Sequence, residues 1–175
     1  NPVFRCLRRV WNLNQAAQPL LALAVALARD PLLRSTQAYL MGRERGATVT
    51  RDEVERFLEQ TFPGRFSPAS LKSFSQNVSG TWTAAGLLQG HLHKVRARVK
   101  VHPESIATLL FLGFLEGRTG QRLFSSDWMT LVELPQDETE ALTKSASDRG
   151  ILVFMNAGGV KEVRFPGYLT TEEEH

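Results

Sequence analysis

Lys94-Val95-Arg96-Ala97-Arg98-Val99-Lys100-Val101 alternates a cation with an apolar residue at every position. Side chains on a strand point alternately to its two faces, so this pattern predicts a strand with one basic and one apolar face. The apolar face would pack on a core, whereas the four like charges would repel one another unless a row of phosphates compensated them. The alternative is a solvated edge strand, because Lys and Arg on an edge prevent unwanted strand pairing.

Two helices are predicted just before this strand. Thr50 and Glu53 have the spacing of a capping box, which indicates a helix over 50–61. Ser67 and Pro68 suit the cap and first turn of a second helix over 67–85. The apolar residues of the second helix recur at helical spacing and are expected in the core: Leu71, Phe74, Val78, Trp82 and Ala85. Its opposite face is polar and carries Lys72, Ser73, Gln76, Ser79, Gly80 and Thr83.

Helix, turn, helix and basic strand follow one another in the order of a winged helix-turn-helix. In that motif the second helix enters the major groove of DNA, and the following strand forms a wing beside the backbone. Gln76 can read a base edge, Lys72 can meet a phosphate, and short polar side chains allow close approach. The predicted DNA-binding residues are Lys72, Ser73, Gln76, Ser79, Thr83, Lys94, Arg96, Arg98 and Lys100, with Arg8 and Arg9 as further phosphate contacts. Two alternatives stay open. The polar face is simply solvated, or the winged unit docks a protein, as other winged folds do.

The whole chain is predicted to be mainly α, in the α+β class: a helical bundle with a winged helix-turn-helix-like centre and a C-terminal helix plus β-hairpin. Further helices are expected over 4–18, 20–28, 31–41, 103–116 and 135–148. Asp30 is expected to cap the 31–41 helix, and Gly86 to end the 67–85 helix. Strands over 151–155 and 160–165 are expected to form the hairpin. The chain is therefore expected to have three segments that form one compact assembly: N-terminal helices (1–48), the winged unit (49–102), and the C-terminal helices with the hairpin (103–175).

Composition is ordinary for a globular protein, and the mildly basic charge is compatible with an acidic partner. The 175 residues carry a net charge of +3, and the first 50 hold seven Arg against only Asp30 and Glu44. Cys6 is the one cysteine, so we expect no disulfide framework, no Cys-rich zinc site and a cytoplasmic location. The longest apolar run, 20–28, is too short to span a bilayer, and no membrane partner is expected.

Three histidines near the basic strand raise the question of a metal site. His91, His93 and His102 have no Cys or acid at ligand spacing, so we expect a partly buried or strand-start pair lying with the valines rather than metal ligands. The 113–117 segment is not a phosphate loop, because no Gly-Lys-Ser/Thr follows it. Since the sequence holds no catalytic constellation, we expect no enzyme activity, no cofactor, no metal and no small-molecule substrate.

Several short motifs together resemble one protein family. They are Thr83-Ala84-Ala85-Gly86-Leu87-Leu88, Gly117-Arg118-Thr119-Gly120-Gln121-Arg122-Leu123, Asp127-Trp128, Arg149-Gly150-Ile151-Leu152-Val153-Phe154 and Val163-Arg164-Phe165-Pro166. Over roughly residues 20–166, the chain resembles the BrxA-like proteins of bacterial BREX (bacteriophage exclusion) systems. The resemblance implies a small, largely helical protein with winged-helix-like parts. It also implies a DNA-binding accessory role in phage defence, with no enzymatic activity of its own.

The function expected from the sequence is therefore non-catalytic binding of double-stranded DNA, with most of the affinity from electrostatic contacts. Other subunits of a defence complex are expected as further partners. Two alternatives stay open: a protein-docking scaffold of a multi-subunit complex, and an RNA-binding helical module.

Overall fold

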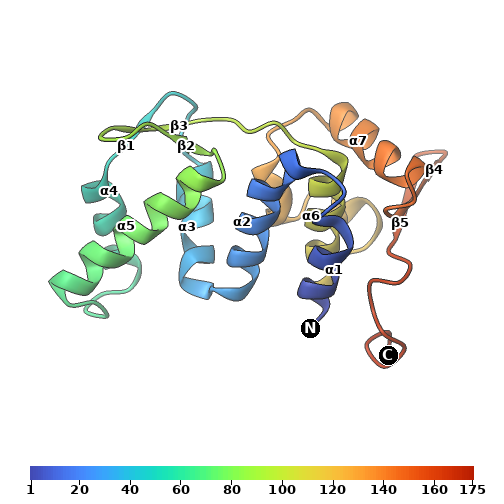
Figure 1. The fold of residues 1–175 in the computed structure, drawn as a ribbon, viewed down its shortest axis with the longest axis horizontal. Helices are drawn as coiled ribbons and strands as arrows, with labels where there is room; N and C mark the ends of the chain where they lie inside the picture. Colours follow the sequence, from blue (N-terminus) through green and yellow to red (C-terminus); the bar gives the residue numbers. More distant parts are fainter. The chain divides into compact units, whose positions relative to one another are not determined.

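A computed structural model describes all 175 residues of the chain (Figure 1). It is mainly helical with two small antiparallel sheets, which confirms the predicted class. The chain divides into two compact units: unit 1 comprises Asn1–Ala28 and Lys100–His175, and unit 2 comprises Arg29–Val99. This division differs from the three expected segments, because the 31–41 helix joins the winged region while the residues before it join the C-terminal part.

Unit 2 consists of three helices and three short strands. In chain order they are α3 (Pro31–Met41), β1 (Thr48–Val49), α4 (Arg51–Thr61), α5 (Pro68–Ala84), β2 (Leu88–Gln89) and β3 (Lys94–Arg96). β3 is the central strand and pairs antiparallel with both others, so Val95 lies opposite Thr48 on one side and Gln89 on the other. A sheet this small needs packing against helices to be stable.

Side-chain caps begin the three helices of unit 2 at the predicted positions. The Asp30 carboxylate accepts from two backbone N–H groups of α3, at 3.0 and 3.2 Å. Thr50 and Glu53 make both reciprocal bonds of the capping box that begins α4. Ser67 Oγ accepts from a backbone N–H of α5 at 3.2 Å. These bonds satisfy N–H groups that the first turn of a helix leaves without partners.

Trp82 of α5 anchors the core of unit 2. Its side chain is 0% exposed, and its Nε1–H donates to Thr36 Oγ1 of α3 at 3.1 Å. Val78, about one turn earlier, is also buried, and Leu71 and Phe74 are half-buried near the start of the helix. The apolar stripe predicted for this helix therefore faces the core.

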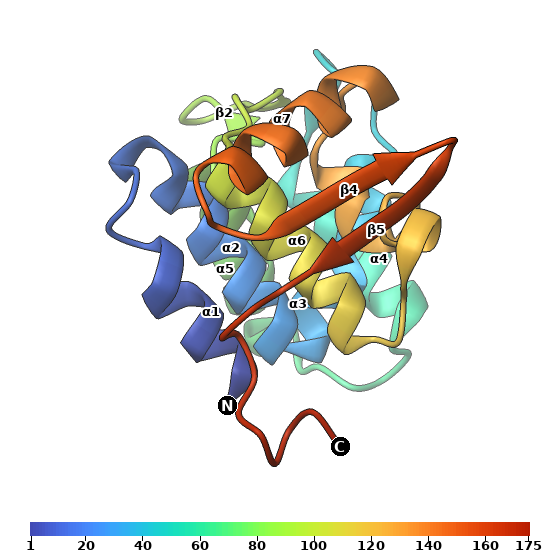
Figure 2. The same cartoon turned by 90° about the vertical axis from the view of Figure 1, so that its right-hand side faces the viewer.

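Unit 1 is built around α6 (Pro103–Leu115), which is buried along nearly its whole length. The other elements are α1 (Pro2–Val10), η1 (Gln15–Ala17), α2 (Gln18–Arg29), η2 (Gly120–Leu123), η3 (Asp127–Leu131), α7 (Gln136–Asp148), β4 (Val153–Ala157) and β5 (Val160–Arg164). α6 packs against α1, α7 and η3, and β4 lies beside α7 (Figure 2). No helix in the structure combines the length and the hydrophobicity needed to cross a membrane.

The first helix is shorter than predicted, because α1 ends at Val10 instead of continuing through residue 18. The Asn14 side chain accepts from the Ala16 N–H at 3.1 Å and begins η1. Asparagine competes for backbone groups in this way, so it favours caps over helix interiors. Helical structure therefore begins again after Asn14, and α2 follows where the sequence predicts a second helix.

Gly86 and Gly150 end α5 and α7 in the same way. Their φ angles are +86° and +74°, in the left-handed region that residues with a Cβ rarely adopt. The following N–H donates to the carbonyl five residues earlier, at 3.2 Å for Leu87 and 2.9 Å for Ile151. This cap explains the Gly-hydrophobic-Leu pattern that the sequence shows at both places, since it turns the chain from a helix into extended structure.

The predicted C-terminal hairpin is confirmed, with β4 shifted two residues toward the C-terminus and β5 one residue shorter than predicted. Ala157 pairs with Val160, so only Gly158 and Gly159 form the turn. Both have positive φ, +58° and +83°, as a two-residue type I′ turn requires.

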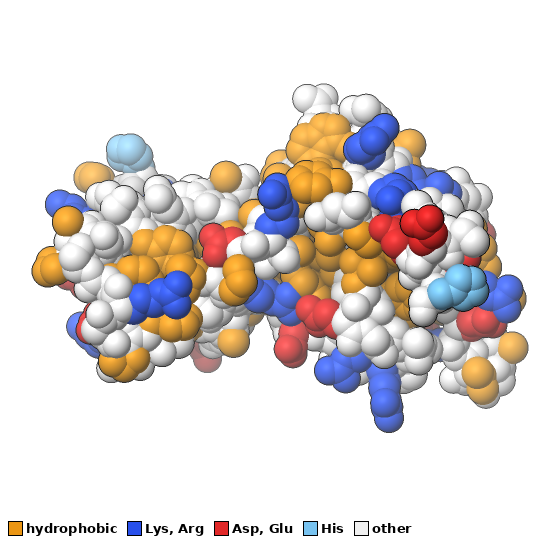
Figure 3. Space-filling model, turned by 90° about the horizontal axis from the view of Figure 1, so that it is seen from below, with side chains coloured by type: hydrophobic (Ala, Val, Ile, Leu, Met, Phe, Trp, Pro, Cys, Tyr) orange, Lys and Arg blue, Asp and Glu red, His pale blue; other side chains and the backbone are white.

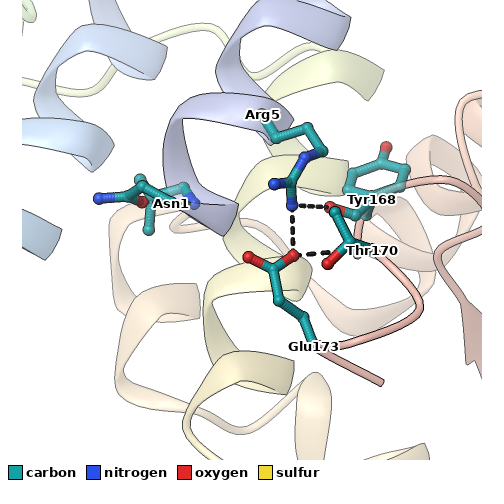
Figure 4. A network of polar contacts seen from close by, with 6 residues as sticks. Asn1, Arg5, Tyr168, Thr170 and Glu173 are labelled. Carbon is teal, nitrogen blue, oxygen red and sulfur yellow. Dashed lines mark hydrogen bonds and ion pairs between the residues drawn. The ribbon is translucent and has the colours of Figure 1, made fainter. Parts of the chain in front are cut away.

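A polar network ties the acidic C-terminal tail to α1 (Figure 4). Arg5 donates to the Tyr168 carbonyl at 3.3 Å and pairs with the Glu173 carboxylate. The backbone N–H of Thr170 donates to the same carboxylate at 3.0 Å. The Thr170 N–H and then Arg5 lower the pKa of Glu173, because both stabilise its charged form. The tail is therefore held while Glu173 is ionised and is expected to loosen as the pH falls through its lowered pKa.

Cys6 is buried in unit 1 beside Thr108, whose Oγ1 lies 3.8 Å from its Sγ. Burial raises the pKa of the thiol to about 12. At pH 8, folded protein should contain about a thousandfold less thiolate than the unfolded chain. An aromatic disulfide reagent should therefore label Cys6 slowly in the folded protein and rapidly in denaturant. Similar rates in both states would show that the thiol is accessible.

Candidate nucleic-acid interface

The polar face of α5 is open to solvent, as predicted. Lys72, Ser73 and Gln76 are exposed, and Ser79 and Thr83 are half-buried. The Thr83 hydroxyl donates to the Ser79 carbonyl at 2.6 Å within the helix, so its oxygen can still accept a hydrogen bond. Five of the predicted contact residues thus share one accessible face of a well-anchored helix.

Gly80 lies on the same face, in the interior of α5. A Cβ added at this position would meet no heavy atom within 4 Å, so packing inside the protein does not require glycine here. Glycine inside a helix costs about 0.5–1 kcal/mol relative to alanine. What glycine provides instead is an open backbone that a ligand can approach closely.

The basic segment differs from its prediction at Arg96. Only Lys94–Arg96 pair in the sheet, and Arg96 is 2% exposed. Arg96 Nε donates to the Leu40 carbonyl at 3.0 Å, and its guanidinium also bonds the Ala97 carbonyl. Leu40 lies in the last turn of α3, where its carbonyl also accepts from the Arg43 N–H at 3.2 Å, and the carboxyl end of a helix attracts a cation. The predicted exposed row of four cations is therefore wrong, and Arg96 is a core residue.

The other three cations of this segment lie outside the core. Arg98 and Lys100 are exposed, and Lys94 is half-buried with its Nζ donating to the Gly90 carbonyl at 2.7 Å. Lys100 begins the second stretch of unit 1 and is not part of unit 2. From the predicted basic strand, unit 2 itself presents Lys94 and Arg98.

A groove of about 300 Å³ lies between the polar face of α5 and the β2–β3 hairpin. The structure brings three of the predicted residues together here: Gln76, Ser79 and Lys94. It adds residues that the sequence reasoning missed, from β1, the start of α4, α5 and the hairpin: Thr48, Val49, Thr50, Arg51, Gly80, His91, Leu92 and His93. Eight of the eleven residues that line it are polar or cationic, and none carries a carboxylate.

The tip of the β2–β3 hairpin, residues 90–93, projects into solvent. Gly90 has a φ of +111°, and a Cβ there would collide with the His93 carbonyl, so the turn requires glycine. His91, Leu92 and His93 are all exposed. The histidine pair is exposed rather than partly buried, because it lies in the turn directly before β3 and not in the strand. Nowhere in the structure do three His, Cys, Asp or Glu side chains meet in a way that could hold a metal ion.

Charge is distributed unequally between the two units. Unit 2 holds eleven Lys and Arg against six Asp and Glu, a net charge of +5. Unit 1 holds ten against twelve, a net charge of −2. The cationic character of the protein therefore belongs to the unit that carries the groove, where it would attract an anionic partner.

Arg8 and Arg9 lie in unit 1, exposed in the last turn of α1. The Arg9 guanidinium is 5.0 Å from the centre of the Tyr168 ring, a cation–π contact. Burial raises the pKa of Tyr168, so its hydroxyl stays protonated and donates to the Ile151 carbonyl at 2.6 Å. Cations also suit the carboxyl end of a helix. These interactions give Arg9 a structural role within unit 1.

A second groove, of about 690 Å³, lies in unit 1 and is largely apolar. Its lining includes the end of α6 and the segment that follows β5, with Phe114, Leu115, Phe165, Pro166 and Leu169. In Figure 3, hydrophobic side chains line a hollow that has acidic and basic side chains at its rim. This chemistry suits apolar side chains of a protein partner better than phosphates.

No protein-family model, no curated protein and no solved structure matches the chain.

Proposed function

We propose that unit 2 is a winged helix-turn-helix that binds double-stranded DNA without catalysing a reaction. Its order of elements supports this: α4 and α5 are joined by a short turn, and the β2–β3 hairpin follows in the position of a wing. In this proposal α5 enters the major groove. The hairpin then contacts the backbone beside it.

The observation that carries the proposal is the groove between α5 and the hairpin. A helix in the major groove and a wing beside it enclose the sugar-phosphate backbone of one strand between them. The groove offers hydroxyls from Thr48, Thr50 and Ser79, and cations from Arg51 and Lys94. Hydroxyls, Arg and Lys are the side chains that most often contact phosphates in protein–DNA complexes.

The exposed residues of α5 have separate roles in this arrangement. Gln76 can make a bidentate contact with the N6 and N7 atoms of adenine, and Gly80 lets the helix backbone come close. Lys72, and Arg98 beyond the strand, meet phosphates. Ser73, Ser79 and Thr83 add short polar contacts. Because unit 2 has a net charge of +5, electrostatic contacts supply most of the affinity.

Replacing Lys72 and Arg98 together with Gln is the test of this interface. If each side chain neutralises one phosphate, the slope of log K against log salt should become shallower by about 1.8, at about 0.9 per contact. Binding should weaken for every duplex sequence. Fluorescence anisotropy with a labelled duplex at several salt concentrations measures both effects.

Lys144→Gln is the matched control, since Lys144 is an exposed lysine of unit 1. Its salt slope should equal that of the unchanged protein. A folded Lys72/Arg98 double variant with an unaltered slope would reject α5 and the basic segment as the DNA interface.

The proposal extends to the setting of the protein. The BrxA-like resemblance favours an accessory protein of the bacterial cytoplasm that acts in phage defence. Other subunits of a defence complex are the second proposed class of partner. The apolar groove of unit 1 is the surface with suitable chemistry for them.

A further inference from the structure

Leu92 is 85% exposed at the tip of the β2–β3 hairpin, more than any other large hydrophobic side chain of the protein. The turn that displays it is well defined, because only glycine fits at Gly90 and the Lys94 ammonium bonds the Gly90 carbonyl at 2.7 Å. An apolar side chain held in water by a specific turn suggests that a ligand covers it.

The surroundings of Leu92 indicate the charge of that ligand. Its neighbours His91 and His93 are exposed, and no acidic residue occurs between Glu59 and Glu104. The groove beside the tip contains Arg51 and Lys94, and unit 2 has a net charge of +5. Leu92 is therefore an isolated apolar contact on a cationic surface, which suits DNA better than an apolar protein face.

We infer that Leu92 inserts into the minor groove of the duplex, with His91 and His93 at its two edges. This inference rests on the proposed function. If α5 lies in the major groove and one backbone passes between α5 and the hairpin, the far side of that backbone is the minor groove. The minor groove is about 6 Å wide, too narrow for a helix but wide enough for single side chains, and leucine is among the residues that proteins insert between its base steps.

The inserted leucine gives the protein a preference for A·T pairs. A G·C pair places the N2 amine of guanine in the minor groove, where it obstructs an apolar side chain, whereas adenine has only a hydrogen at the equivalent position. Inosine lacks this amine, so an I·C pair resembles A·T in the minor groove but resembles G·C in the major groove. Contact in the minor groove therefore distinguishes I·C from G·C, whereas contact in the major groove does not.

The experiment measures binding to three duplexes of alternating sequence, built from A·T, I·C or G·C pairs only. The unchanged protein should bind the I·C duplex about tenfold more tightly than the G·C duplex, and the A·T duplex at least as tightly as I·C, because Gln76 can also read adenine in the major groove. Leu92→Ala should remove the difference between I·C and G·C and leave the salt slope unchanged, since leucine carries no charge. Val160→Ala is the control: Val160 is 73% exposed beside the turn of the other hairpin, in unit 1, and its loss should change nothing.

Two results would overturn the inference while leaving the proposed function in place. They are equal binding of the unchanged protein to I·C and G·C, and a preference for I·C over G·C that survives Leu92→Ala. Absence of binding to all three duplexes would overturn the inference and the proposed function together.

Discussion

Trp82→Ala is expected to lower the free energy of unfolding by about 3–5 kcal/mol, the usual range for a tryptophan removed from a core. The side chain is 0% exposed and connects α5 to α3 through its bond to Thr36. Its loss leaves a cavity and one buried hydroxyl without its indole donor. Chemical denaturation followed by circular dichroism measures the change.

Gln76→Ala is the control for this prediction, because Gln76 is exposed on the opposite face of the same helix. It should change the stability by no more than about 0.5 kcal/mol while weakening DNA binding. If Gln76→Ala unfolded the protein and Trp82→Ala did not, the orientation of α5 would be wrong.

Arg96→Met is expected to cost about 1.5–3 kcal/mol of stability, the range for hydrogen bonds to charged groups. Methionine keeps much of the volume but leaves the carbonyls of Leu40 and Ala97 without the guanidinium. The loss should appear in denaturation without DNA.

Arg98→Gln provides the contrast, since Arg98 lies two residues later in the chain and is exposed. It should leave stability unchanged and weaken DNA binding. A stable Arg96→Met variant that bound DNA as weakly as Arg98→Gln would contradict the buried role of Arg96 and support the predicted exposed row of four cations.

The features that sequence predicted correctly are those set by residues close together in the chain. Asp30, Thr50 and Ser67 begin helices through side-chain bonds that span only two or three residues. The stripe that ends at Trp82 has helical spacing, and helical spacing determines which face is buried. Gly86 likewise ends α5 through a local bond.

The errors arise where distant segments decide the outcome. Alternation correctly places Lys94 and Arg96 on one face of β3, but it does not say which face is buried. The end of α3, more than fifty residues earlier, supplies the carbonyl that draws Arg96 inward. β1 has only two residues and pairs with β3 across the whole of α4 and α5, so no local pattern indicates it. The groove depends on this pairing, and its residues from β1 and the hairpin tip were missed for the same reason.

The most direct measurement is a salt titration of the whole protein against a labelled duplex, the matching single strand, and a double-stranded RNA of the same sequence. Four cations of unit 2, Arg51 and Lys94 in the groove and Lys72 and Arg98 outside it, predict tightest binding to duplex DNA, with a slope of log K against log salt of about −3.6. RNA should bind more weakly, because its deep, narrow major groove does not admit a helix such as α5. No salt-dependent binding to the DNA duplex, or tighter binding to RNA, would contradict a winged helix-turn-helix that binds DNA.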